Sequence, residues 1–178
     1  MLFTADPDPW NAGCARPERL KRRAILALLG PRKMAVGLEL GCGGGVHTAD
    51  LAARILHLDA LDASAEALRH AEARLADTPG VTLHRAALSA APPRRGLQAV
   101  VASEVLYYLA PGALARQIAL LRPALARGAV LVTAHTVRRH RDFAQSPQAV
   151  ERALECAFGP PRRERLGFGW RALAFTAR

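Results

Sequence analysis

Short apolar runs alternate with amphipathic segments along most of this chain of 178 residues. Each run is about as long as a strand, and each amphipathic segment has the spacing of a helix. Continuous apolar strands separated by helices are typical of a parallel sheet that is covered on both faces. The alternation therefore predicts an α/β fold with a Rossmann-like, doubly wound sheet. The runs expected to form its parallel strands are residues 36–40, 55–61, 81–85, 99–103 and 129–133.

The segments between these runs carry helix signals. Ser64 is placed to cap a helix, and Ser146 followed by Pro147 opens another one. Pro123 is expected to kink or shorten a third helix. Two final apolar runs, joined by a glycine-rich turn, predict an antiparallel hairpin that completes a seven-stranded, mostly parallel sheet with helices on both faces. The expected helices are 19–29, 48–54, 64–76 and a stripe over 114–125, and the hairpin strands are 162–166 and 170–176.

Length and composition indicate one globular domain over residues 1–178. Its expected parts are an N-terminal arm and helix (1–30), a cofactor-binding core (35–135) and a C-terminal helix and hairpin (136–178). A hydrophobic content of 51% with 22% charged residues is a globular composition. No apolar run approaches the roughly 20 residues that span a bilayer. The first residues do not resemble a secretory signal, and three scattered cysteines suggest neither disulfides nor a metal site, so we expect a cytoplasmic protein.

A glycine-rich loop follows the first predicted strand, in the sequence Leu-Glu-Leu-Gly-Cys-Gly-Gly-Gly that ends at Gly45. Glycines allow a sharp turn and let a ligand approach the backbone, although a plain tight turn is the alternative. The third glycine comes one position earlier than in the dinucleotide fingerprint. Glu39 at the strand end would repel a diphosphate but suits a cationic ligand that carries a sulfonium and an ammonium. The expected ligand-binding residues of this loop are Glu39, Gly41, Cys42, Gly43 and Gly45.

Asp62 ends the second predicted strand, 21 residues beyond Gly41. A carboxylate at this offset is placed to accept the ribose hydroxyls of a nucleoside. The alternative is a local role in capping the helix that Ser64 begins. Asp59 falls inside the same strand, where a charge is costly unless it is paired, and the sequence offers no explanation for it.

Three strings carry a resemblance to a known family. Leu-Glu-Leu-Gly-Cys-Gly-Gly-Gly, Leu-Asp-Ala-Ser and Ser-Glu-Val-Leu-Tyr-Tyr-Leu (103–109) resemble the first, second and fourth motifs of class I S-adenosylmethionine-dependent methyltransferases. The last string, with Asp8-Pro9-Trp10, is similar to the nodulation protein S (NodS)-like branch over about residues 8–155. The resemblance implies S-adenosylmethionine as cofactor, further cofactor contacts at Ala63, Ala87 and Leu88, and N-methylation of an amino sugar. Ala87 stands where the family often has an acid.

Two residues are candidates for proton transfer, which an amine acceptor requires. Glu104 follows the fourth strand and could contact the cofactor, hold an acceptor ammonium or take its proton; its alternative is an acid favoured at a helix start. His135 follows the fifth strand and is a candidate base, with a surface loop histidine as the alternative. The expected substrate-binding residues are Trp10, Tyr107 and Tyr108, and Cys42 is expected to contribute its backbone and not a thiolate.

The acceptor is expected to be a small molecule, most simply an amine. A net charge of +10 and the arginine groups at 138–141 and 162–165 keep an RNA methyltransferase as an alternative, although a solvated surface is the simpler explanation and nucleic acid is not favoured. A third hypothesis is a domain that binds S-adenosylmethionine without transferring a methyl group. The sequence does not predict an oligomeric state.

Overall fold

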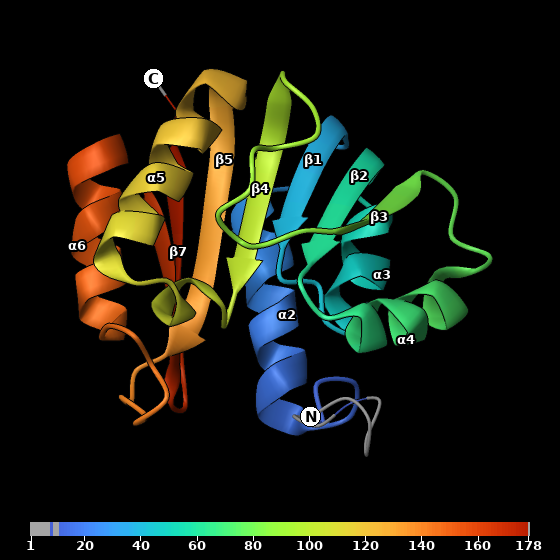
Figure 1. The fold of residues 1–178 in the computed structure, drawn as a ribbon, viewed down its shortest axis with the longest axis horizontal. Helices are drawn as coiled ribbons and strands as arrows, with labels where there is room; N and C mark the ends of the chain where they lie inside the picture. Colours follow the sequence, from blue (N-terminus) through green and yellow to red (C-terminus); the bar gives the residue numbers. More distant parts are fainter. Residues whose placement is uncertain (1–7, 9–10, 178) are drawn as a thin grey trace.

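The computed structural model describes Asp8 and residues 11–177. Seven strands form one sheet in the order β3-β2-β1-β4-β5-β7-β6 (Figure 1). β1 to β5 run parallel, β7 pairs antiparallel with β5, and β6 pairs antiparallel with β7. This confirms the Rossmann-like fold with an antiparallel C-terminal hairpin. The strands are β1 Met34–Leu40, β2 Ile55–Asp62, β3 Val81–Arg85, β4 Leu97–Ser103, β5 Leu125–Thr136, β6 Arg163–Gly167 and β7 Trp170–Thr176.

Helices cover both faces of this sheet. α5 and α6 pack on one face, and α2 and α3 lie on the other (Figure 1). Alternate strand residues serve the two faces: Val100 belongs to the core under α5 and α6, and Val101 to the core under α2 and α3. The helices are α2 Arg16–Leu29, α3 Val46–Ala52, α4 Ala65–Leu75, α5 Pro111–Leu121 and α6 Pro147–Phe158, with short 3-10 turns η1 Leu106–Tyr108 and η2 Arg122–Ala124.

Local signals explain where the helices begin and end. The hydroxyls of Ser64 and Ser146 each accept a hydrogen bond from the backbone N–H three residues later, so both are N-caps as expected. The stripe predicted over 114–125 is shortened, because Pro123 lies in η2 and Leu125 already belongs to β5. β5 therefore begins four residues before the predicted strand 129–133.

α2 differs from the prediction in the face that it buries. Within the expected helix 19–29, a spacing of four residues predicts an apolar stripe through Leu20, Ala24 and Leu28, but Leu20 is exposed. The buried face runs through Lys21, Ile25 and Leu28. The buried face thus starts one residue later than the predicted stripe, at Lys21 in place of Leu20. Burial of Lys21 is tolerated because its ammonium is paired with Glu18 and Glu104.

The charge that the sequence left unexplained is also paired. Asp59 in β2 is 1% exposed, and its carboxylate lies 2.7 Å from Nε2 of His84 and 2.8 Å from Nε of Arg94. His84 belongs to β3, and Arg94 to the loop that leads into β4. Asp59 therefore fastens this loop, which also carries Leu88, to the sheet. Within the described residues, no helix has the length and apolar character needed to cross a membrane.

Candidate active site

A cavity of about 530 Å³ opens at the carboxyl ends of the parallel strands. It lies where the chain moves outward from β1 in opposite directions, to β2 on one side and β4 on the other. Ligands of doubly wound sheets bind at this position. The glycine loop, the ends of β2 and β4, the start of α2 and the loop after β5 all contribute to its lining.

The glycine loop turns sharply through left-handed backbone at Gly41, Gly43 and Gly45, with φ of 72°, 53° and 78°. A Cβ atom at Gly41 would collide with the side chain of Val105. Gly41, Cys42 and Gly43 line the cavity as expected. Gly45 does not: a Cβ atom there would lie 3.1 Å from Cα of Ala71, so this glycine allows α3 to begin against α4.

Asp62 has a local structural role and also lies at the cavity. Its Oδ2 accepts a hydrogen bond from the backbone N–H of Gly43 at 2.9 Å, and its Oδ1 accepts one from Ser64 at 2.8 Å. The carboxylate thus joins the glycine loop to the start of α4 while it lines the cavity. Two carboxylate oxygens offer about four acceptor positions, so Asp62 retains capacity for ligand hydroxyls.

Two of the three residues for which the resemblance implies further cofactor contacts line the cavity, and one does not. Ala63 and Leu88 line the cavity, together with Asp62. Ala87 is not among the lining residues, so the described structure does not bring this predicted contact to the site.

Glu39 is buried at the end of β1 and lines the cavity. Burial raises the pKa of its carboxyl to about 7, against the lowering effect of the hydrogen bond from Thr48, and the negative charges of Asp62 and Asp50 raise it further. The hydroxyl of Thr48 donates to Oε2 at 2.6 Å. A carboxyl with this pKa changes its charge near neutral pH.

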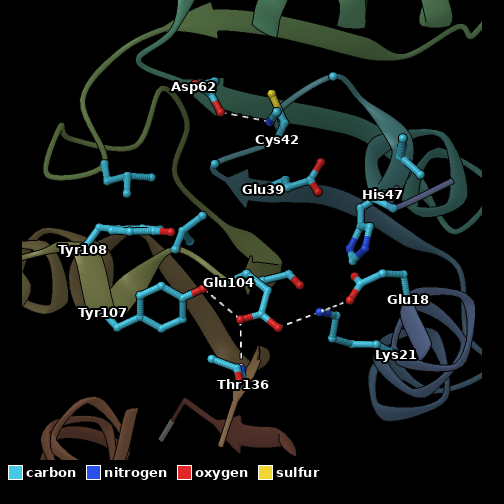
Figure 2. Close-up of a pocket in the computed structure, with 18 of the residues that line it drawn as sticks. Glu18, Lys21, Glu39, Cys42, His47, Asp62, Glu104, Tyr107, Tyr108 and Thr136 are labelled. Carbon is cyan, nitrogen blue, oxygen red and sulfur yellow. Dashed lines mark hydrogen bonds and ion pairs between the residues drawn. The ribbon is translucent and has the colours of Figure 1, made fainter. Parts of the chain in front are cut away.

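Cys42 lies beside Glu39 and Asp62 in the glycine loop (Figure 2). Burial raises the pKa of its thiol, and the negative charges of these two carboxylates raise it further. The thiol therefore stays protonated and is a poor nucleophile. Its backbone N–H donates to the carbonyl oxygen of Leu61, which ties the glycine loop to the end of β2.

Glu104 is held by donors from three other parts of the chain (Figure 2). Lys21 Nζ lies 2.5 Å from its Oε1, while the Tyr107 hydroxyl and the backbone N–H of Thr136 each donate to its Oε2 at 2.9 Å. Its backbone is left-handed, with φ of 57°, which is unusual outside glycine. Lys21 is 2% exposed and also pairs with Glu18 at 2.9 Å. Glu104 is thus a fixed, charge-compensated part of the cavity lining.

His135 does not lie where the sequence suggested. It is 2% exposed, its Nε2 lies 2.7 Å from Oε1 of Glu151 on α6, and it is not among the lining residues. The hydrogen bond from His135 lowers the pKa of Glu151 more than burial raises it. Because strand residues alternate between faces, the next residue, Thr136, lines the cavity in its place. The expectation of a base at His135 is therefore corrected.

Tyr107 and Tyr108 both line the cavity, as expected for substrate-binding residues. Tyr107 is buried and Tyr108 is 43% exposed. The ring of Tyr107 stacks on Phe143, with centroids 3.7 Å apart and planes at 21°. Trp10, the third expected substrate residue, lies outside the described residues.

Sequence reasoning missed several lining residues, including Lys21, His47, Asp142 and Phe143. Lys21 had a signal, because it stands four and seven residues before Ile25 and Leu28 on the buried helix face. His47 is half-buried in the first turn of α3. Burial lowers the pKa of its imidazole to about 3, helped by the positive charges of Lys21 and Arg22, so the ring is neutral.

The sheet order, the glycine loop after β1 and the acid at the end of β2 define a class I methyltransferase, a class whose cofactor is S-adenosylmethionine. Residues 38–128, half of the chain, match the methyltransferase domain family, and the chain belongs to this family. An uncharacterized methyltransferase of Mycobacterium tuberculosis and one of Mycobacterium bovis are each 35% identical over 101 residues, 57% of this chain and 48% of the relative. The chain thus spans about half the length of these curated relatives.

Solved structures show the same fold. N-methyltransferase NodS from Bradyrhizobium japonicum, in complex with S-adenosyl-L-homocysteine, superposes with a TM-score of 0.87 over 98% of this chain and 96% of its own, at 22% identity. An S-adenosylmethionine-dependent methyltransferase from Clostridium acetobutylicum has a TM-score of 0.76 over 98% of this chain and 97% of its own, at 12% identity. At these identities, the similarity concerns the fold.

Proposed function

We propose that this protein transfers the methyl group of S-adenosylmethionine to an amine of a small molecule, such as an amino sugar. The charge of the cavity carries this proposal. Of the fifteen acidic residues in the chain, six line the cavity, whereas Lys21 is the sole lysine or arginine among the described lining residues. Lys21 balances one of these charges and Glu39 is partly protonated near neutral pH, but an excess of acidic groups remains, and a cleft lined by negative charge concentrates cations. The acidic lining residues are Asp8, Glu18, Glu39, Asp62, Glu104 and Asp142.

The residues present fit the cofactor. The Asp62 carboxylate has acceptor capacity for ribose hydroxyls, and Ala63 and Leu88 offer apolar contact to a base. The open backbone of the glycine loop and the Glu39 carboxyl suit the charged amino acid portion. When bound, S-adenosylmethionine supplies an electrophilic methyl group on a sulfonium. The volume of about 530 Å³ lies within the range of roughly 300–1,000 Å³ that is usual for ligand pockets.

The contribution of the chain to the reaction is mainly alignment. Tyr107, Thr136 and Lys21 fix Glu104, so this part of the cavity is rigid before an acceptor arrives. Holding two reactants in a reactive geometry can supply roughly 7–11 kcal/mol of the barrier reduction. The Glu104 carboxylate is compensated by Lys21, and for this reason we assign it to positioning and to the field of the cavity.

A transfer assay with methyl-labelled S-adenosylmethionine tests the proposal. The acceptors are glucosamine and a deacetylated chitooligosaccharide, with N-acetylglucosamine as the matched neutral sugar. We expect label on the amino sugars and none on the acetylated one, with mass spectrometry placing one methyl group on nitrogen. Label on no amine, from folded protein that binds the cofactor, would contradict the amine acceptor. That result would favour a domain that binds S-adenosylmethionine without transferring its methyl group.

RNA is the second candidate acceptor, and one surface feature favours it. Arg138, Arg139 and Arg141 are exposed, and His140 between them lines the cavity. A filter-binding measurement across salt concentrations separates the candidates, because phosphate contacts give an affinity that falls steeply with salt. We expect weak RNA binding whose affinity depends little on salt. Tight, strongly salt-dependent binding, together with methyl transfer to RNA, would identify RNA as the acceptor in place of an amine.

A further inference from the structure

An aromatic wall forms one part of the cavity lining, separate from the glycine loop. Its members are Tyr107 and Tyr108 from η1 and Phe143 from the loop after β5. Figure 2 shows both tyrosines on the opposite side of the cavity from His47. The glycine loop and Asp62 account for the cofactor in the proposed function, where this wall contributes the hydrogen bond from Tyr107 to Glu104.

The three rings pack at well-defined angles. Tyr107 and Phe143 stack, and both are buried, so they form the base of the wall. Tyr108 meets Tyr107 edge to face with centroids 4.8 Å apart, and meets Phe143 edge to face at 5.6 Å. Because Tyr108 is 43% exposed and lines the cavity, part of its ring is open to a ligand.

Hydrogen bonds hold the two segments of this wall together. Gln145 Nε2 donates to the carbonyl oxygen of Leu109 at 2.6 Å, and the backbone N–H of Gln145 donates to the carbonyl oxygen of Tyr107 at 3.2 Å. The Tyr107 hydroxyl is fixed by Glu104. A wall that is ordered before binding loses little entropy when a ligand arrives.

The charge beside the wall is negative. Asp142 precedes Phe143 and lines the cavity, as does Glu104 beneath Tyr107. The negative charge of Asp142 adds to burial in raising the pKa of Tyr108, so its phenol stays protonated. Aromatic faces with nearby carboxylates attract ammonium groups, and an exposed aromatic ring offers an apolar surface to the C–H face of a sugar ring. The lining lysine, Lys21, is already bonded to Glu18 and Glu104.

We propose that Tyr107, Tyr108, Phe143 and Asp142 form an acceptor subsite for a ring-bearing amine, with the ring of the ligand against Tyr108 and its nitrogen toward Asp142. The subsite binds the protonated amine, which releases its proton to solvent before the nitrogen lone pair accepts the methyl group. This inference rests on the proposed function and narrows it. An acceptor must combine a cationic nitrogen with a ring, while phosphorylated or carboxylated molecules are rejected by the carboxylates. Tyr108 and Asp142 are then specificity-determining residues.

Ligand-observed NMR on the full chain tests this subsite directly. The probes are glucosamine, N-acetylglucosamine as the same ring without the charge, and ethanolamine as an amine without a ring. Each is titrated with and without saturating S-adenosylhomocysteine. We expect glucosamine to bind about 5- to 10-fold more tightly than either of the others, with saturation transfer to its ring protons.

Three variants assign the effect to residues. Tyr108→Ala should lose the preference for a ring, whereas Tyr108→Phe, which keeps the aromatic ring, should retain that preference. Asp142→Asn should weaken the binding of glucosamine about 5-fold and leave the affinity for N-acetylglucosamine unchanged. Glu72→Gln, on the exposed side of α4, is the matched control for charge removal and should change nothing.

The possible results separate the two proposals. If S-adenosylhomocysteine binds but glucosamine has no advantage, or if Tyr108→Ala behaves like the unaltered protein, the subsite is overturned and the cofactor assignment stands. If S-adenosylhomocysteine fails to bind, the proposed function falls. In that case, the titration without it still decides whether the aromatic wall takes a ring-bearing ammonium.

Discussion

Lys21 Nζ lies 2.5 Å from Oε1 of Glu104, so an ion pair between a buried lysine and a partly buried glutamate joins residues 83 positions apart. Lys21 belongs to α2, and Glu104 follows the carboxyl end of β4. The pair fastens α2 to the edge of the sheet where the cavity opens, as Figure 2 shows. It also sets the charge of the lining, because it occupies the one lysine that the described residues bring to the cavity.

Replacing Lys21 should therefore destabilise the protein strongly. In Lys21→Met, Glu18 and Glu104 lose their shared cation at a partly buried position, and breaking a buried pair costs about 3–5 kcal/mol. Urea unfolding measures the loss. Arg69→Met is the control, because Arg69 pairs with Glu66 on the surface of α4, and exposed pairs contribute about 0–1 kcal/mol. Equal losses in the two variants would contradict the structural importance of the buried pair.

Glu39 should make stability depend on pH between its ordinary pKa of 4.5 and its folded value of about 7. In this window the folded protein holds a proton that the unfolded chain has released, so the free energy of unfolding falls as pH rises. The total change is on the order of 3 kcal/mol, since one pKa unit corresponds to about 1.4 kcal/mol.

Denaturant titrations across that window compare the unaltered protein with Glu39→Gln. The difference between their unfolding free energies isolates Glu39 from the other titrating groups, which both proteins share. We expect the unaltered protein to lose stability relative to Glu39→Gln as pH increases. A constant difference would show that Glu39 does not titrate in this range.

Two glycines with similar backbone angles allow the cost of left-handed backbone to be separated from the cost of steric crowding. Gly45 has φ of 78° and close neighbours on α4, whereas Gly96 has φ of 72° and open space around its Cβ position. Gly96→Ala should cost about 1–2 kcal/mol for left-handed backbone alone. Gly45→Ala should cost about 1–3 kcal/mol more, because Ala71 and Leu75 must move. Thermal or urea unfolding measures the loss of stability in each variant. Equal losses would mean that α3 and α4 move apart at no cost in free energy, which would contradict the role given to Gly45.

His135 should act on stability and not on ligand binding. His135→Ala removes a buried hydrogen bond to Glu151, which Arg171 still holds at 2.7 Å, so the expected loss is about 1–3 kcal/mol. Affinity for S-adenosylhomocysteine, measured by calorimetry below the unfolding temperature, should be unchanged. A loss of affinity for S-adenosylhomocysteine in the folded variant would contradict this and would indicate that His135 contributes to the binding site.

The part of the cavity formed by the glycine loop and Asp62 could be predicted because these residues are close in sequence. The glycine loop and Asp62 occupy a strand, a turn and the end of the next strand, so spacing alone brings them together. The alternation of runs likewise fixed the type of each element. Boundaries were less accurate where one segment serves two elements, as at Leu125, where a helical stripe continues in sequence but the backbone has already become β5.

The other half of the site depends on contacts that sequence spacing does not contain. Lys21 meets Glu104, and Phe143 stacks on Tyr107, only after the sheet has formed. His135 illustrates a different limit. A strand turns neighbouring residues to opposite faces, so an error of one position at its end exchanges a cavity residue, Thr136, for a buried one.

Isothermal titration of the full chain with S-adenosylhomocysteine tests the central claim most directly, because it requires no acceptor. We expect saturable binding to one site, and at least about 10-fold weaker binding to Asp62→Asn, since an uncharged amide is a weaker acceptor for hydroxyls than a carboxylate. Glu72→Gln is the control and should bind like the unaltered protein. Absence of heat from folded protein, or equal affinity in Asp62→Asn, would contradict the assignment of this cavity to S-adenosylmethionine.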